Sequence, residues 1–576
     1  MSMRGHSGVS AELAAVDGRR RINMDKVMTG ICFVLLLIIV VIPIVMIIYN
    51  AFFNEGRLEI EMFRTQMTDS KNLDAMFNTL KIAIGATVLG TIMGVFYAWL
   101  LGRSDIPAKG LMRALFNIPY MFPPFLGAMA WDMMFNGRSG YINKWLASVF
   151  HLESMPININ SVWGIIFVEV SYYFPFVFMQ VVSALERMDP TLEESARIAG
   201  ARQHQVIWKI TLPLVKPAIS AGALLILTTS LAHFGVPSIL GYAKGIYTLP
   251  TRIYAVIYNS GGSFDGIRQG AALSVMLVIV VSLALILQNR ILSAGSYDII
   301  KGKSMRPTLI KLRGAKIPLF LLAIFTLVLI VIVPLVMIVL ISFLKAYGLP
   351  LQFKNFTLAQ YQKVFSANGT IDSIRNSLFA SITAGVVCMF LGTLVAYVVQ
   401  KIRPKGKEVL EVVSMLPYAI PGTVLSIGVI LAWSGRIFGI NLYNTIWIIL
   451  VAYLARYLSF SMKTSSAALL QVHSSLEEAA RVCGASHTEG LADITLPLIR
   501  PAMVSGFFLI FLPAMREVTT SILLYGPYTR TLGVQIYSLR DAGMIPQAAA
   551  LATVAIGIII VLNTIVTHVT KDRKGV

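Results

Sequence analysis

EESARIAGARQHQVIWKITLPLVKP, from Glu193 to Pro217, occurs again as EEAARVCGASHTEGLADITLPLIRP, from Glu477 to Pro501. The two copies are identical at 12 of 25 positions without a gap, and both are polar segments of a mostly apolar chain. Similar composition alone would not keep Gly200 and Gly484, or the Leu-Pro-Leu segments that follow them, in register. The repeat therefore predicts two equivalent docking sites.

The composition is that of a polytopic membrane protein. Of the 576 residues, 56% are hydrophobic and 13% are charged, with a mean hydropathy of +0.74; about a quarter of the residues of a soluble domain are charged. A span needs roughly 20 mostly apolar residues. Twelve such segments are predicted, at 27–53, 78–102, 112–135, 161–186, 218–241, 271–292, 317–344, 376–400, 409–433, 443–469, 502–524 and 547–569.

These segments form two sets of six that resemble each other. VIPIVMIIYNAFF around Pro43 recurs as VIVPLVMIVLISFL around Pro334, and the Ile-Pro-Tyr ending at Tyr120 recurs as the Leu-Pro-Tyr ending at Tyr418. Because each half has an even number of spans, both halves enter the membrane from the same side and a pseudo-two-fold axis is expected along the membrane normal. We predict an all-α fold of 12 transmembrane helices in two tandem six-helix repeats.

The expected organisation has five parts. Two six-span domains carry the apolar segments, and polar segments precede, connect and follow them. The parts are an N-terminal segment 1–26, a first domain 27–292, a basic linker 293–316, a second domain 317–569 and a tail 570–576.

The basic residues predict the orientation, because cytoplasmic loops hold an excess of Lys and Arg. With the N-terminus inside, the cytoplasmic segments and adjoining span ends collect 30 of the 48 Lys and Arg residues, and the outer segments collect 15. Both termini and both repeated loops are therefore expected in the cytoplasm. The net charge of +20 indicates topology and contact with anionic lipid rather than nucleic-acid binding.

Each repeated loop has the features of two short helices joined by a turn. Thr191-x-x-Glu194 and Ser475-x-x-Glu478 have the spacing of a capping box and predict a helix start. Gly200 or Gly484 then permits a turn that other residues resist. A single loop of this kind would be interpreted as an amphipathic linker, but the duplication favours a docking element.

The spacing Glu-x-Ala-x-x-x-Gly followed by Ile-x-Leu-Pro resembles the EAA motif of the membrane subunits of binding-protein-dependent ABC importers, with Ser195 as a small-for-small departure. Each half resembles one permease domain of the type I importer fold. The resemblance implies two cytosolic ATPase subunits that carry ATP and Mg, an extracytoplasmic solute-binding protein and a bacterial inner-membrane location. It also implies ATPase-coupling residues, namely Glu194, Ala196, Gly200, Ala201, Glu478, Ala480, Gly484 and Ala485.

The chain itself is not expected to hydrolyse ATP or to bind a cofactor. A phosphate-binding P-loop needs G-x-x-x-x-G-K-[ST] after a strand. Gly302-Lys303-Ser304 approaches it, but Tyr297 stands where the first glycine should be. No metal-ligand spacing and no pairing of a nucleophile with a base is present in the sequence, which disfavours a membrane enzyme.

Ionisable residues within spans are costly and usually face a cavity or each other. Those proposed for the substrate pathway are Arg456, Arg516, Glu517 and His233, with Glu169 and Asp132 as further candidates. In one helix, Arg516 and Glu517 would face about 100° apart and could not pair face to face. A structural network that braces the spans is the competing interpretation, and arginines favour an anionic solute whereas carboxylates and histidine favour a cation.

The fusion of two permease domains, with the segment 234–241 at the end of the fifth span and the segment 517–524 in the second half, resembles the ferric-iron importer permeases. The resemblance implies iron(III) as the first candidate solute. Permeases for 2-aminoethylphosphonate or other organophosphates, and then for thiamine or polyamines, are similar alternatives. A secondary transporter also has twelve spans in two halves, but it does not explain two such loops.

Overall fold

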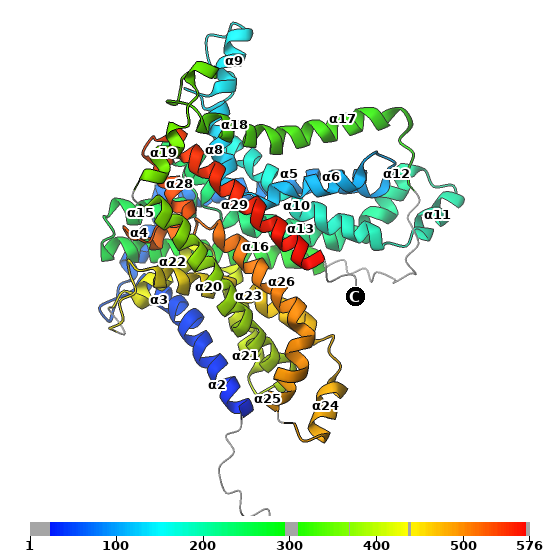
Figure 1. Cartoon of the computed structure of the whole chain (residues 1–576), viewed down its shortest axis with the longest axis vertical. Helices are drawn as coiled ribbons and strands as arrows, with labels where there is room; N and C mark the ends of the chain where they lie inside the picture. Colours follow the sequence, from blue (N-terminus) through cyan, green and yellow to red (C-terminus); the bar gives the residue numbers. More distant parts are fainter. Residues whose placement is uncertain (1–23, 294–308, 368, 436–438, 486, 572–576) are drawn as a thin grey trace, which may run out of the picture.

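The protein is helical almost throughout its computed structural model, which describes residues 24–293, 309–367, 369–435, 439–485 and 487–571 (Figure 1). A two-stranded antiparallel hairpin, β1 (Phe53–Asn54) and β2 (Arg57–Leu58), accompanies the helices. The predicted all-α fold is therefore confirmed. Most of the predicted N-terminal segment and linker, including Gly302-Lys303-Ser304, and most of the tail lie outside the described residues.

Each half contributes a set of long apolar helices. In the first half these are α2 (Met24–Leu36) with α3 (Ile42–Phe52), α5 (Ser70–Arg103), α10 (Val162–Arg187), α13 (Leu212–Leu231) and α16 (Phe264–Ser293). In the second half they are α17 (Lys316–Leu327) with α18 (Val333–Ser342), α20 (Thr370–Tyr397), α21 (Lys407–Ala419) with α22 (Gly422–Trp433), α23 (Ile446–Leu469), α26 (Leu496–Met515) and α29 (Ile545–Lys571).

Ten helices of the described chain are long and apolar enough to cross a membrane, and α21 with α22, bent by 115°, is an eleventh candidate. The remaining expected segment, 112–135, is divided into α6 (Lys109–Phe116), α7 (Ile118–Met121) and α8 (Pro124–Phe135). Prolines cause the break between α7 and α8, because Pro123 and Pro124 lack backbone N–H groups and disfavour helix in the preceding residue.

The predicted fifth and eleventh spans, 218–241 and 502–524, begin and end earlier than expected, at Gln203–Leu231 and Leu491–Met515. Helix α13 ends at Leu231 and is followed by the separate short helix α14 (Gly235–Leu240), and α26 ends at Met515 before α27 (Ser521–Leu524). The intervening residues are therefore irregular backbone at the centre of the protein. Irregular backbone at membrane depth is tolerated where it lies inside protein or lines a cavity.

The two halves repeat each other in backbone detail. A π-helical turn, η1 (Leu37–Val41) or η5 (Val328–Ile332), comes just before Pro43 or Pro334. Proline removes a helical hydrogen bond, and a local π turn accommodates the loss. The equivalent helices α15 (Leu249–Asn259) and α28 (Leu532–Asp541) are also held alike: Leu249 N–H donates to Thr79 Oγ1 (2.8 Å) and Leu532 N–H donates to Ser377 Oγ (2.7 Å).

The first span of each half packs on the other half. Helix α3 lies against α22, and α2 lies against α20 and α21. Helix α18 lies against α8, and Tyr97 of α5 shares a 2.6 Å hydrogen bond with Thr326 of α17. This exchange, visible at the lower left and upper right of Figure 1, ties the halves together.

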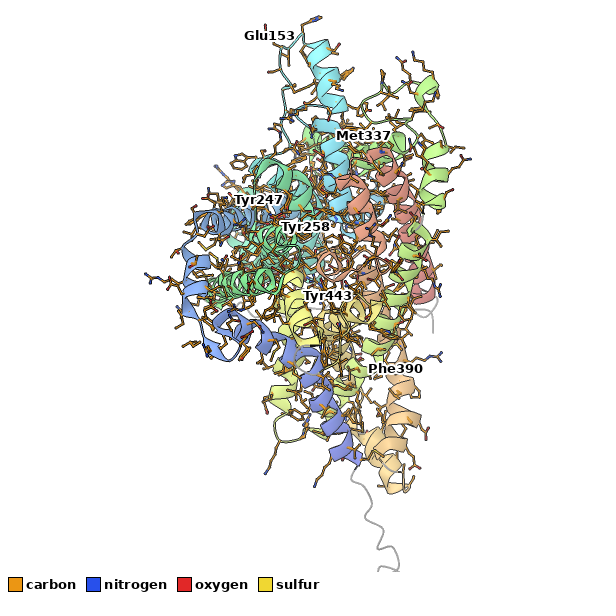
Figure 2. The ribbon with its side chains drawn as sticks, turned by 90° about the vertical axis from the view of Figure 1, so that its left-hand side faces the viewer. Glu153, Tyr247, Tyr258, Met337, Phe390 and Tyr443 are labelled. Carbon is orange, nitrogen blue, oxygen red and sulfur yellow. The ribbon has the colours of Figure 1, made fainter. Side chains whose placement is uncertain are left out.

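The helical bundles of the two halves diverge towards the ends that carry the repeated loops (Figure 1). The first loop contains α11 (Thr191–Ile198), α12 (Gln203–Val206) and η2 (Ile207–Thr211), and the second contains α24 (Ser474–Val482), α25 (His487–Gly490) and η8 (Leu491–Thr495). The left-hand side of Figure 1, opposite the first loop, is turned towards the viewer in Figure 2, where Tyr258 of the first half and Tyr443 of the second are seen on the same side of the molecule.

Candidate functional site

A cavity of about 490 Å³ lies between the two halves. It is placed where α7, α10 and the end of α13 meet α21, α23 and the end of α26, so the broken helices of both halves form its wall. Ligand cavities of roughly 300–1,000 Å³ commonly lie between helices. All four residues predicted for the substrate pathway line it: His233, Arg456, Arg516 and Glu517.

Aromatic side chains from equivalent positions line both sides of the cavity. Tyr120 and Tyr418 follow the matching prolines of the two halves. When the alignment of the two loops is extended backwards without a gap, the first residue of α10, Val162, corresponds to the first residue of α23, Ile446. The same alignment matches two pairs of residues that line the cavity, Tyr173 with Tyr457 and Phe176 with Phe460. Comparison of the two halves is the sequence signal that could have found these aromatic residues.

The second half contributes a paired arginine and glutamate. Arg456 Nε lies 3.6 Å from Glu517 Oε2, which also accepts a 2.6 Å hydrogen bond from the Tyr457 hydroxyl. The N–H of Thr520 donates to Glu517 Oε1 (2.9 Å). Gly422 leaves the space for Arg456, because a Cβ at that position would lie 1.8 Å from Arg456 Nη1.

The first half contributes a histidine and a glutamate. His233 Nδ1 lies 3.0 Å from Glu169 Oε1, and the Ser230 hydroxyl donates to Glu169 Oε2. The His233 ring also contacts the edge of the Tyr173 ring, with centroids 5.5 Å apart. Glu169 is fully buried and does not line the cavity; it contacts His233, which does.

The polar groups of the two halves are not copies of each other. In the loop register, His233 corresponds to Glu517, Glu169 to Tyr453 and Tyr172 to Arg456. Duplicated helices thus place a carboxylate on α10 in one half and at the end of α26 in the other. The resulting cavity is symmetric in its aromatic wall and asymmetric in its charges.

Arg516 and Glu517 do not share a helix, so the premise that they face about 100° apart in one helix is wrong. Helix α26 ends at Met515, and both residues lie in the irregular segment after it. Arg516 Nη1 crosses to the first half and donates to the carbonyl oxygens of Tyr120 (2.7 Å) and Met121 (2.6 Å). Glu517 instead turns to Arg456 within its own half.

Asp132 lies outside the cavity and belongs to a structural network. Its carboxylate accepts hydrogen bonds from Asn136 Nδ2 (2.9 Å) and Asn160 Nδ2 (2.8 Å), and it pairs with Arg540 of the second half (3.1 Å). The bracing interpretation applies to this residue. The partner Arg540 was not among the sequence candidates, because it lies in a segment expected to be an outer loop.

The repeated loops have the predicted glycine turns. Gly200 and Gly484 have φ values of +86° and +92°, which favour glycine. The N–H of Ala201 donates to the carbonyl of Ala196 (2.9 Å) across the first turn, the hydrogen bond that closes a helix C-terminus of this type. Ala480 and Ala485 repeat it at 3.0 Å.

The predicted capping boxes are wrong. Thr191 is the first residue of α11 and its side chain does not cap the helix; the Asp189 carboxylate instead accepts a hydrogen bond from the Thr191 N–H (2.9 Å). This hydrogen bond holds the pKa of Asp189 below its usual value. In the second loop α24 begins at Ser474, so Ser475 is already inside the helix and its N–H donates to His473 Nδ1 (3.3 Å).

The first loop is anchored to the membrane domain by Glu193. This side chain is 2% exposed, accepts a 2.7 Å hydrogen bond from Thr211 and lies 3.7 Å from the buried guanidinium of Arg103, at the end of α5. Glu194 is half-buried and Glu478 exposed. The residues predicted for coupling therefore divide into exposed or partly exposed glutamates and glycines, and alanines that close the turns.

The described residues contain no group of three or more His, Cys, Asp and Glu side chains that could hold a metal ion. The family model for binding-protein-dependent transport system inner membrane components matches residues 86–295 and again 389–571, one match in each half. The chain belongs to this family. Its members are permeases, and the apolar helices described above accord with a multi-pass inner-membrane permease.

Three relatives illustrate the similarity. A ferric transport system permease protein, FbpB, of Actinobacillus pleuropneumoniae is 27% identical over 561 residues, which cover 96% of this chain and 79% of the relative. A sulfate transport system permease protein, CysW, of Synechocystis is 29% identical over 267 residues, covering 44% of this permease and 89% of the relative. A protein named for 2-aminoethylphosphonate transport, from Salmonella typhimurium, is 32% identical over 202 residues, which cover 35% of this permease and 70% of the relative.

Proposed function

We propose that this permease is the membrane subunit of an ATP-driven importer, and that two cytosolic ATPase subunits dock on its two repeated loops. The observation that carries the proposal is a pair of exposed apolar side chains at equivalent positions of α11 and α24. Ile198 is 88% exposed and Val482 is 89% exposed, next to the turns at Gly200 and Gly484. Large apolar side chains presented on protruding helices are typical of a protein interface.

In this proposal the glutamates and glycines contact the ATPases. Glu194 and Glu478 offer carboxylates to basic groups of a partner. Apart from the chain neighbours of each glycine, no atom of the described residues lies within 4 Å of a Cβ placed at Gly200 or Gly484. A bulky residue at these glycines would strain the left-handed backbone of the turn, and its side chain would extend to where the partner docks. ATP and Mg are bound by the ATPase subunits.

The divergent bundles suggest how docking drives transport. The loops lie at the separated ends of the two bundles (Figure 1), so two ATPases that close on ATP would draw these ends together. In this proposal the cavity between the halves would then be closed towards the loops and open on the other side. This is alternating access by rocking of two halves around a central site, with the loops and both termini in the cytoplasm and a solute-binding protein at the outer face.

Ferric iron is the proposed solute. The supporting observation is that a permease named for ferric transport matches 96% of this chain. An organophosphonate is the second candidate, because the protein named for 2-aminoethylphosphonate transport is 32% identical over a shorter stretch and Arg516 lines the cavity.

Substitution of the exposed apolar pair tests the docking. The Ile198→Asp, Val482→Asp double variant should abolish ATP-dependent uptake into proteoliposomes and lower co-purification of the ATPase at least tenfold. The matched control is Phe353→Asp, which alters a 93% exposed side chain outside both loops and should leave co-purification of the ATPase unchanged. Full uptake in the double variant would reject the docking sites.

A panel of labelled solutes tests the cargo and the class of transporter. Uptake of iron(III) should require ATP and the binding protein, and it should be insensitive to a protonophore. Uptake of 2-aminoethylphosphonate instead would replace the iron assignment without affecting the docking sites. Uptake that an uncoupler abolishes would indicate a secondary transporter.

A further inference from the structure

One edge of the Arg516 guanidinium, formed by Nε and Nη2, has no partner among the described residues. Its Nη1 atom donates to the carbonyl oxygens of Tyr120 and Met121, and its guanidinium carbon lies 5.5 Å from the centre of the Tyr120 ring. Within the described part of the chain, its Nε and Nη2 atoms have no hydrogen-bond acceptor and no carboxylate lies within ion-pair distance. Arg516 thus lines the cavity with donors available to a solute.

The other arginines at the contact between the halves are already neutralised. Arg456 pairs with Glu517, and Arg540 pairs with Asp132. The Arg516 guanidinium instead rests on carbonyl oxygens and an aromatic face, which hold a guanidinium in place but leave its formal charge uncompensated. The cavity therefore has a surplus positive charge at this position.

An oxyanion is the chemical group that fits such an edge. The planar guanidinium fork binds carboxylate, phosphonate or sulfate oxygens through two parallel hydrogen bonds. A bare metal cation would be repelled by the same charge. The two carbonyl contacts fix one end of the guanidinium before a solute arrives, so little side-chain freedom is lost on binding.

We propose that Arg516 binds an oxyanion group of the transported solute, and that an iron cargo crosses with anionic oxygen ligands and not as a bare ion. The oxyanion belongs either to a phosphonate solute or to a ligand that travels with the metal. The proposal rests on the proposed function only in taking the central cavity as the solute path.

Protection of the arginine from chemical modification tests binding without any ATPase. The full chain in nanodiscs is treated with phenylglyoxal, and modification of Arg516 is followed by peptide mass spectrometry. Ferric citrate or 2-aminoethylphosphonate should slow this modification at least fivefold. Putrescine at matched ionic strength should not, and the exposed Arg313, outside the cavity, should react at the same rate throughout.

The arms of this experiment separate the two sources of the oxyanion. If ferric citrate protects Arg516 more than iron-free citrate does, the oxyanion belongs to a ligand of the metal. If only the phosphonate protects Arg516, the oxyanion belongs to the solute itself. Absence of protection by every anion overturns the proposal. A visible tyrosinate-to-iron charge-transfer band on adding ferric citrate also overturns it, since the metal would then bind the cavity tyrosines directly.

Uptake measurements separate recognition of the solute by Arg516 from a purely structural role, in which Arg516 only joins the two halves. Arg516→Lys keeps the charge and can still donate to the two carbonyls, but it lacks the fork. It should raise the KM for the anionic solute at least tenfold with less than a twofold change in maximal rate. A fall in maximal rate at unchanged KM would show that Arg516 only joins the two halves and would reject the proposal. Protection of Arg516 in a chain that shows no ATP-dependent uptake would reject the proposed function alone.

Discussion

Arg540 Nη2 lies 3.1 Å from Asp132 Oδ2, so an ion pair joins α28 of the second half to α8 of the first. The same guanidinium atom donates to the carbonyl of Ile239 (2.8 Å). When Leu249 is aligned with Leu532, Arg540 corresponds to Ile257; when Tyr120 is aligned with Tyr418, Asp132 corresponds to Ile430. Both isoleucines are buried. The contact between the halves is therefore ionic on one side of the pseudo-two-fold axis and apolar on the other.

Replacement of this ion pair by its apolar counterpart is expected to be tolerated where single replacements are not. Asp132→Ile or Arg540→Ile alone leaves a mostly buried charge without its partner, which costs up to about 3–5 kcal/mol. The double variant removes both charges and should regain most of the lost stability. Thermal unfolding of all four proteins in detergent measures the coupling, and additive losses in the double variant would contradict it.

Gly422 is predicted to set the position of Arg456. A Cβ at residue 422 would lie 1.8 Å from Arg456 Nη1 and 2.6 Å from Thr520 Oγ1. Gly422→Ala should therefore displace the arginine from Glu517, lower stability by about 1–3 kcal/mol and reduce uptake. The matched control is Gly110→Ala in α6, where the new Cβ meets nothing within 4 Å; equal effects of the two substitutions would refute the steric explanation.

Apolar length and the repeat predicted the class of fold, and the charges within spans pointed to residues that line a cavity. Apolar length identifies a helix of 20 or more residues, and intramembrane charges are too costly to be placed without a polar environment. Arg456, Arg516, Glu517 and His233 accordingly meet at one cavity.

Other features depend on contacts that one segment alone does not encode. The break between α21 and α22 lies at Pro421, but the local sequence does not specify the 115° angle between them. The partners of Asp132 and Glu193 come from distant helices. The capping boxes failed for a local reason: the upstream side chains of Asp189 and His473 accept the hydrogen bonds of Thr191 and Ser475.

Glu193 is predicted to transmit force from the first loop to α5. Its carboxylate is the acceptor for Thr211 and the counter-charge of buried Arg103. Glu193→Gln keeps the acceptor but removes the charge, so the complex should still assemble while more ATP is hydrolysed per solute transported. Thr211→Val, which removes the hydrogen bond and keeps the ion pair, should have a smaller effect. An unchanged ratio of ATP to solute in Glu193→Gln would exclude this role.

The end of α5 is also predicted to hold the chain that enters the second half, in a pH-dependent way. Asp105 Oδ1 accepts a hydrogen bond from the Leu312 N–H (3.0 Å), and Lys316 lies 3.2 Å from Oδ2. The hydrogen bond from Leu312 and the charge of Lys316 hold the pKa of Asp105 below its usual value of 3.8. The contact therefore adds stability above the unfolded-state pKa and loses it as the pH falls through the lower folded-state pKa.

Hydrogen exchange of the segment 309–316 measures this contribution. Asp105→Asn lacks the charge, so at pH 7 the Leu312 amide should exchange faster in the variant than in the unsubstituted protein. After correction for intrinsic exchange rates, the difference should shrink as the pH is lowered below about 4, where the unfolded carboxyl protonates. A difference that stays constant between pH 7 and pH 3 would show that the ionised carboxylate does not hold this segment.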